Sequence, residues 1–86
     1  MKKEQIDMGW QIVVVDQGFV YVGKVRYTGT GFVEITNADN LRQWGTTRGL
    51  GELAHGPTAK TVRDPVGIVM VPVGRVVLYI ATTGWE

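Results

Sequence analysis

The chain has 86 residues and carries nine lysine and arginine residues against eight acidic ones, for a net charge of +1 at pH 7. It contains no cysteine, no serine and a single histidine, His55. These counts exclude a disulfide framework, cysteine or serine nucleophiles and multi-histidine metal sites. A charge so near zero also argues against a broad surface for extended nucleic acid.

Stiff β-branched side chains dominate the composition, with 14 valines, five isoleucines and nine threonines against four leucines and four alanines. Such side chains favour strands over helices, and 12 glycines divide the chain into short pieces. We therefore expect one all-β or β-dominated domain over residues 1–86, a small bent antiparallel sheet or barrel with one short helix. No apolar run reaches the roughly 20 residues that span a bilayer, so we expect a cytoplasmic protein without membrane contact.

Alternating apolar patterns and turn residues predict the elements in chain order, after a loosely docked terminus over residues 1–8. The expected strands cover residues 10–15, 19–27, 32–36, 41–44, 68–73 and 75–81. Turns are expected at residues 16–18, 28–31 and 37–40, where glycine, asparagine and aspartate cluster. Within the second strand, Gly23 indicates a bulge or a close backbone approach.

Residues 50–55 fit a short helix whose apolar side chains recur at the spacing of one face. Gly56 stands where a C-terminal cap belongs, and Pro57 forbids continuation of the helix. The following stretch, residues 57–67, is expected to be irregular. A helix this short is stable only when it packs on the sheet, and Trp85 is expected to pack there rather than extend into solvent.

The strands at residues 12–15, 19–22 and 75–81 are apolar on both faces. One small sheet with one short helix cannot cover all of these faces, and an uncovered apolar patch usually marks an interface. We therefore expect a homo-oligomer, with a dimer as the simplest unit.

Sequence signals for catalysis are weak. Gly49-Leu50-Gly51 lacks the third glycine of a dinucleotide fingerprint, and no Gly-Lys-Thr ends a phosphate loop. His55, near the end of the expected helix, is better explained as a cation at the helix dipole than as a general base. We therefore expect a protein that is not an enzyme and uses no cofactor or metal ion.

The segment of residues 37–48 is the part of the chain that indicates a ligand. The candidate ligand-binding residues are Asn40, Arg42, Trp44, Thr46, Thr47 and Arg48. Guanidinium groups can fork onto a phosphate and tryptophan offers a plane for stacking, while threonine hydroxyls and loop amides complete an anion cradle. The alternative is structural, with Trp44 in the core and with Arg42 and Arg48 either solvated or paired with Glu34, Asp39 or Glu52.

The same region carries a family resemblance. The run Trp44–Ala54 (WGTTRGLGELA), followed by Gly-Pro-Thr at 56–58, Asp-Pro-Val-Gly at 64–67 and Val-Pro at 71–72, resembles a family of small phage- and prophage-encoded proteins. That family is catalogued mainly as a domain of unknown function. Its relatives include members with two aromatic residues near the position of Trp44, where this chain has Arg42 and Gln43. The resemblance implies a phage origin and a site of action in the host cytoplasm.

Two hypotheses of function follow. The first is an oligomeric binding module that sequesters a small anionic, nucleotide-derived ligand in phage–host conflict, by analogy with phage proteins that remove nucleotide signals of bacterial defence. The second is a protein–protein inhibitor or assembly factor that acts on a host or phage protein and has no small-molecule ligand. An accessory nucleic-acid binder is disfavoured by the net charge.

Overall fold

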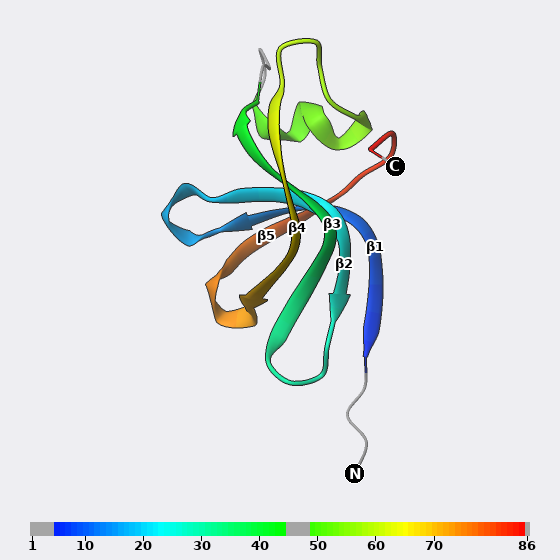
Figure 1. Cartoon of the computed structure of the whole chain (residues 1–86), viewed down its shortest axis with the longest axis vertical. Helices are drawn as coiled ribbons and strands as arrows, with labels where there is room; N and C mark the ends of the chain where they lie inside the picture. Colours follow the sequence, from blue (N-terminus) through cyan, green and yellow to red (C-terminus); the bar gives the residue numbers. More distant parts are fainter. Residues whose placement is uncertain (1–4, 45–48, 86) are drawn as a thin grey trace.

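A computed structural model describes residues 5–44 and 49–85 of the chain. Five strands form one antiparallel sheet in the order β4-β3-β2-β1-β5 (Figure 1). The strands are β1 (Ile6–Val15), β2 (Val20–Tyr27), β3 (Phe32–Gln43), β4 (Val62–Pro72) and β5 (Val76–Ala81). Short 3-10 helices connect them, namely η1 (Asp16–Gly18), η2 (Leu50–His55) and η3 (Val73–Arg75). The expected β-dominated antiparallel fold is confirmed.

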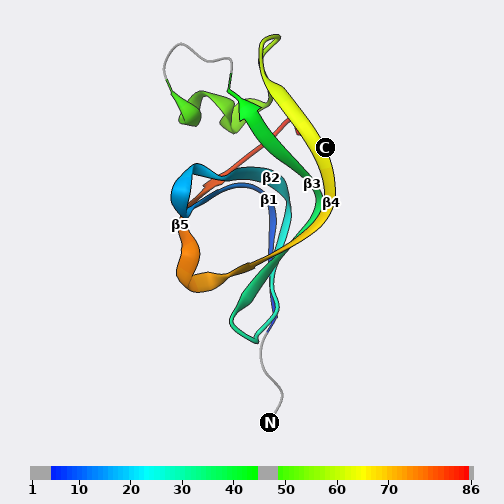
Figure 2. The ribbon, with the colours of Figure 1, turned by 60° about the vertical axis from the view of Figure 1, so that its left-hand side comes forward.

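The sheet is strongly bent and rolls over itself, so that η3 joins β4 to β5 across its open side (Figure 2). It does not close into a barrel, because in the described residues β4 pairs with β3 and β5 pairs with β1, but β4 and β5 do not pair with each other. β3 and β4 run past the other strands as a two-stranded ribbon beside η2 (Figures 1 and 2). No helix in the described ranges is long and apolar enough to cross a membrane.

Two apolar clusters hold the sheet, one on each of its faces. The inner cluster draws on all five strands and includes Val13, Val25 and Ile35, with Val71 of β4 and Tyr79 of β5 beside them. Burial raises the pKa of the Tyr79 hydroxyl above its ordinary value. The inner face of the central strands is therefore covered by the roll of the sheet itself.

The outer cluster combines Ile12 of β1 and Val22 of β2 with Leu41 of β3, and η2 and the C-terminal segment cover them through Leu53 and Trp85. Successive residues such as Ile12 and Val13 are thus both fully buried on opposite faces. The chain itself covers both faces of its central strands, and the large exposed apolar side chains gather instead on the edge strands.

Gly23 lies at a close approach between β2 and β3. The register between the two strands shifts between Val22 and Lys24. A Cβ atom at Gly23 would lie 2.7 Å from both the Ile35 side chain and the Thr36 carbonyl oxygen. The predicted bulge and close approach are both confirmed.

The expected turn at residues 37–40 and the separate short strand at 41–44 are wrong. β3 continues from Phe32 to Gln43, and Asn37 accommodates an irregularity with a left-handed φ of 51°. β3 pairs with a strand on each side here, since Asp39 stands opposite Val22 of β2 and opposite Pro65 of β4. This pairing outweighs the turn preference of residues 37–40.

The expectation of irregular structure at residues 57–67 is also wrong over its second half, because β4 begins at Val62. Pro65 and Gly67 fit inside this strand because it lies at the edge of the sheet, where a missing amide hydrogen is tolerated. Gly67 has a φ of 82° beside a register shift against β3. The sequence signals at Asp64-Pro65 thus mark a bulged edge strand and not a loop.

The helix at Leu50–His55 is confirmed as a 3-10 helix, in which Leu53 is fully buried and the Gly56 N–H donates to the Leu53 carbonyl oxygen at 3.1 Å. The C-terminal segment packs against it, as expected for Trp85. The indole Nε1–H of Trp85 donates to the same Leu53 carbonyl at 2.7 Å, and the Thr83 N–H donates to the Ala54 carbonyl at 2.8 Å. The helix and the last residues therefore form one unit on the outer face.

Candidate functional site

A cleft of about 480 Å³ opens on the outer face of the sheet, between β1, the β3–β4 ribbon and the C-terminal segment. The cleft is lined by Trp10 of β1, by Trp85 of the C-terminal segment, and by Asn37 and Asp39 of β3. β4 contributes Arg63, with the backbone around Pro65 and Gly67. We call this the tryptophan cleft.

Within the tryptophan cleft, Arg63 contacts both Trp85 and Asp39. Trp85 is only 3% exposed, and the Arg63 guanidinium lies over its ring, 5.3 Å from the ring centre. The Nε atom of Arg63 lies 2.9 Å from Oδ2 of Asp39, whose side chain is largely buried. A guanidinium that is held at one edge by a carboxylate and on one face by an aromatic ring is fixed in orientation.

The irregularity in β3 shapes the opposite wall. The register against β4 shifts between Ile35 and Ala38 and again between Ala38 and Asp39. Asparagine enters the left-handed region more readily than most residues, and Asn37 does so here with its side chain exposed. Bulges of this kind re-aim side chains and recur beside binding sites.

Several polar atoms of the tryptophan cleft have no hydrogen-bond partner within the described residues. They are the Asn37 amide, the Trp10 Nε1–H, Oδ1 of Asp39 and the two terminal nitrogens of Arg63. The amide oxygen of Asn37 and Oδ1 of Asp39 accept hydrogen bonds. The amide nitrogen of Asn37, Nε1 of Trp10 and the terminal nitrogens of Arg63 donate them. The cleft therefore offers flat surfaces together with hydrogen-bonding groups of both kinds.

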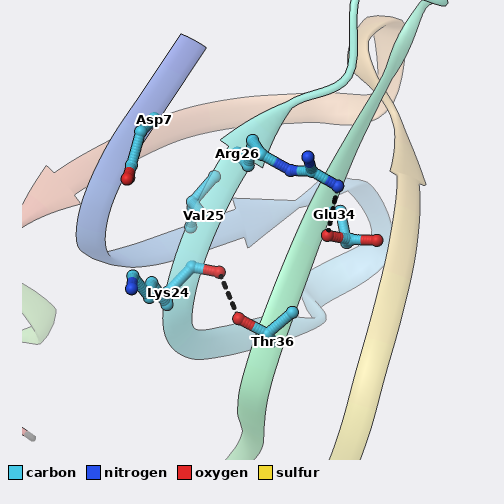
Figure 3. Close-up of a pocket in the computed structure, with 6 residues that line it drawn as sticks. All are labelled: Asp7, Lys24, Val25, Arg26, Glu34 and Thr36. Atoms are coloured by element: carbon cyan, nitrogen blue, oxygen red, sulfur yellow. Dashed lines mark hydrogen bonds and ion pairs between the residues drawn. The ribbon is translucent and has the colours of Figure 1, made fainter. Parts of the chain in front are cut away.

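A smaller depression of about 190 Å³ lies on the same face, lined by Asp7, Lys24, Val25, Arg26, Glu34 and Thr36 (Figure 3). Trp10 stands opposite Lys24, and Lys24 stands opposite Thr36, so these three residues form one row across three strands. Arg26 is paired with Glu34 at 2.9 Å, as the dashed line in Figure 3 shows. Lys24 is exposed and forms no ion pair with any described residue.

The sequence-predicted ligand residues lie elsewhere. Asn40 stands opposite Tyr21, which packs in the inner cluster, so Asn40 and Arg42 belong to the other face of the ribbon. Arg42 pairs with Asp64 at 3.0 Å, and both side chains are about half exposed or more. Asp64 is none of the three carboxylates that the structural alternative names, but the exposure of Arg42 fits the solvated form of that alternative.

Trp44 is 39% exposed, which does not fit the alternative of a core residue, and its carbonyl oxygen accepts a hydrogen bond from the Thr61 hydroxyl at 2.6 Å. Thr46, Thr47 and Arg48 lie outside the described residues. The structure brings Asn40 and Arg42 to one shallow surface with Asp64, and their role in ligand binding stays a prediction.

Sequence patterns did not single out Trp10, Asn37, Asp39 and Arg63 as one site. These residues come from β1, β3 and β4, and only the bend of the sheet brings them together. No group of three or more histidine, cysteine, aspartate or glutamate side chains among the described residues is placed to hold a metal ion. His55 does not line the cleft.

Comparison of the chain with protein-family models, with curated proteins and with solved structures finds no match.

Proposed function

We propose that the protein is a binding module for a small anionic, nucleotide-derived ligand whose base enters the tryptophan cleft. The observation that supports this is the convergence of Trp10 and Arg63 on one cleft that also presents the unpaired Asn37 amide. Proteins that bind unpaired bases hold the flat ring on tryptophan or guanidinium planes and read its edge with hydrogen bonds.

The polar groups favour a base that carries an exocyclic amino group. Oδ1 of Asp39 accepts such a hydrogen bond, while Oδ2 stays with Arg63 at 2.9 Å. The Asn37 amide can donate to a ring nitrogen and accept from the same amino group, which is the pairing that asparagine makes with adenine. Adenine therefore fits these groups better than uracil.

The charges nearby favour a single phosphate group. Arg63 is balanced by Asp39 and Arg26 by Glu34, so among these three cations Lys24 is the one that forms no ion pair with a described residue. Lys24 stands beside Trp10 in the row across the sheet. Asp7 lines the same depression, so a chain of phosphates would meet a carboxylate there.

Calorimetric titration with adenosine, AMP and UMP tests this function. We expect AMP to bind, UMP to bind at least tenfold more weakly, and Trp10→Ala to lower the AMP affinity about tenfold or more, the usual size of one lost stacking contact. Asn37→Gly keeps the left-handed backbone available and should also weaken AMP, so the result does not depend on one variant's folding. Lys24→Ala should weaken AMP and leave adenosine unchanged.

Arg42→Ala is the matched control, because Arg42 is an exposed arginine on the other face of the ribbon. AMP affinity that falls in Arg42→Ala and persists in Trp10→Ala would move the ligand to the sequence-predicted residues. Binding of none of the three probes to the parent protein would exclude this function.

A second candidate is a protein inhibitor or assembly factor, in the phage–host setting that the family resemblance implies. Its support is the set of exposed apolar side chains on the edge strands, namely Val62, Val66, Ile68, Met70, Val77 and Leu78. For such a protein, AMP would leave the melting temperature unchanged, whereas a ligand that binds the folded state raises it.

A further inference from the structure

The sheet has two free edges of unlike character. β4 bonds only to β3 and β5 only to β1 in the described chain, so the outer side of each strand presents unpaired backbone amides and carbonyls. β5 (Val76–Ala81) contains no charged residue, no glycine and no proline. An uncharged β-branched edge of this kind pairs readily with another strand unless something covers it.

The two most exposed large apolar side chains of the described residues lie on these edge strands. Ile68 of β4 is 67% exposed and Val77 of β5 is 62% exposed, and Met70 and Leu78 on the same two strands are 49% and 44% exposed. The first half of β4 is protected by Pro65 and by the ion-paired Arg63. The part of β4 that remains open to pairing is therefore Ile68–Val71, and on β5 it is Leu78–Ala81, beyond the irregularity near Val77.

We propose that a second copy of this chain covers these edges, with β4 of one copy pairing with β5 of the next in a closed ring. Pairing β5 with another β5 would leave Ile68 and Met70 in solvent, whereas pairing β4 with β5 covers both edges of every copy. A contact between two unlike surfaces closes into a cyclic oligomer when its rotation permits.

The charge of the chain supports self-association. No charged residue occurs in Ile68–Val71 or in Leu78–Ala81, so two copies meet there without repulsion. The net charge of +1 also keeps long-range repulsion between copies small. Neither open segment lines the tryptophan cleft, so this proposal does not depend on the proposed ligand.

Two complementary variants test the ring by analytical ultracentrifugation. Ile68→Lys places a charge on the β4 edge and Leu78→Lys, inside the open segment, places one on the β5 edge. We expect the parent protein to sediment as an oligomer and each variant alone as a monomer at micromolar concentration. An equimolar mixture of the two variants should form a dimer, because one intact β4 edge and one intact β5 edge remain.

Ile6→Lys is the matched control, since Ile6 is also an exposed isoleucine but belongs to β1, outside both proposed pairing segments. It should keep the oligomeric state of the parent. Circular dichroism melting confirms that each variant is folded. A monomeric parent would overturn the proposal, and so would an Ile68→Lys variant that stays oligomeric, which would indicate pairing through β5 alone. Variants that sediment as monomers alone and fail to combine would exclude the β4–β5 contact.

Discussion

At Gly23 the hydrogen atom in place of a side chain allows β2 and β3 to come together. An added Cβ would lie 2.7 Å from the Thr36 carbonyl oxygen, which belongs to the backbone and cannot swing away. We expect Gly23→Ala to lower the free energy of unfolding by about 1–3 kcal/mol, as overpacked core sites do, measured by urea denaturation. Gly51→Ala is the control, because nothing lies within 4 Å of a Cβ there. Equal stability of the two variants would contradict the close approach.

Single residues also show where sequence reasoning reaches its limit. A glycine within a strand pattern is a local signal for a bulge or a close backbone approach, and Gly23 carries that signal. Asn37 carried the same kind of signal, but a left-handed asparagine occurs both in turns and in bulges. Only the pairing of β3 with β2 and β4 on either side decides between the two.

Among the elements, η2 depends on the sheet and on the C-terminal segment for its stability, because a helix of this length does not persist alone. Leu53 is fully buried between Ile12, Leu41 and Trp85 in the outer cluster. We expect Leu53→Ala to lower the free energy of unfolding by about 2–5 kcal/mol, measured by chemical denaturation. Leu50→Ala, at a half-buried position of the same helix, should cost clearly less. Similar losses in both variants would mean that η2 is not packed through Leu53.

The elements that local sequence signals define were predicted correctly, and those that depend on the whole sheet were not. The hairpin strands around residues 10–15 and 19–27 follow from β-branched runs and a glycine turn. β4 was missed over Val62–Gly67 because proline and glycine read as loop signals unless the strand is known to lie at an edge, and edge position is a property of the whole sheet. The tryptophan cleft was missed for the same reason, since Trp10 and Arg63 meet only through the bend.

For the whole molecule, surface charge contributes little to stability. The four ion pairs of the described residues all have at least one partner more than 40% exposed. Exposed pairs are worth about 0–1 kcal/mol each, and about 1 M NaCl shortens the screening length to about 3 Å. We therefore expect the free energy of unfolding to change by less than about 1 kcal/mol between low and high NaCl. A loss of several kcal/mol would show that ion pairs hold the fold.

The three tryptophans occupy three different environments, and this makes the protein its own optical probe. Trp85 is almost fully buried, Trp10 is partly buried beside the cleft, and Trp44 is 39% exposed at the end of β3. Indole emission shifts to longer wavelength as water reaches the ring, so we expect the emission maximum to move to longer wavelength from Trp85 to Trp10 to Trp44. Single replacements by phenylalanine would assign each band, and undocking of the C-terminal segment, occupation of the cleft and changes beyond β3 could then be followed separately without any label.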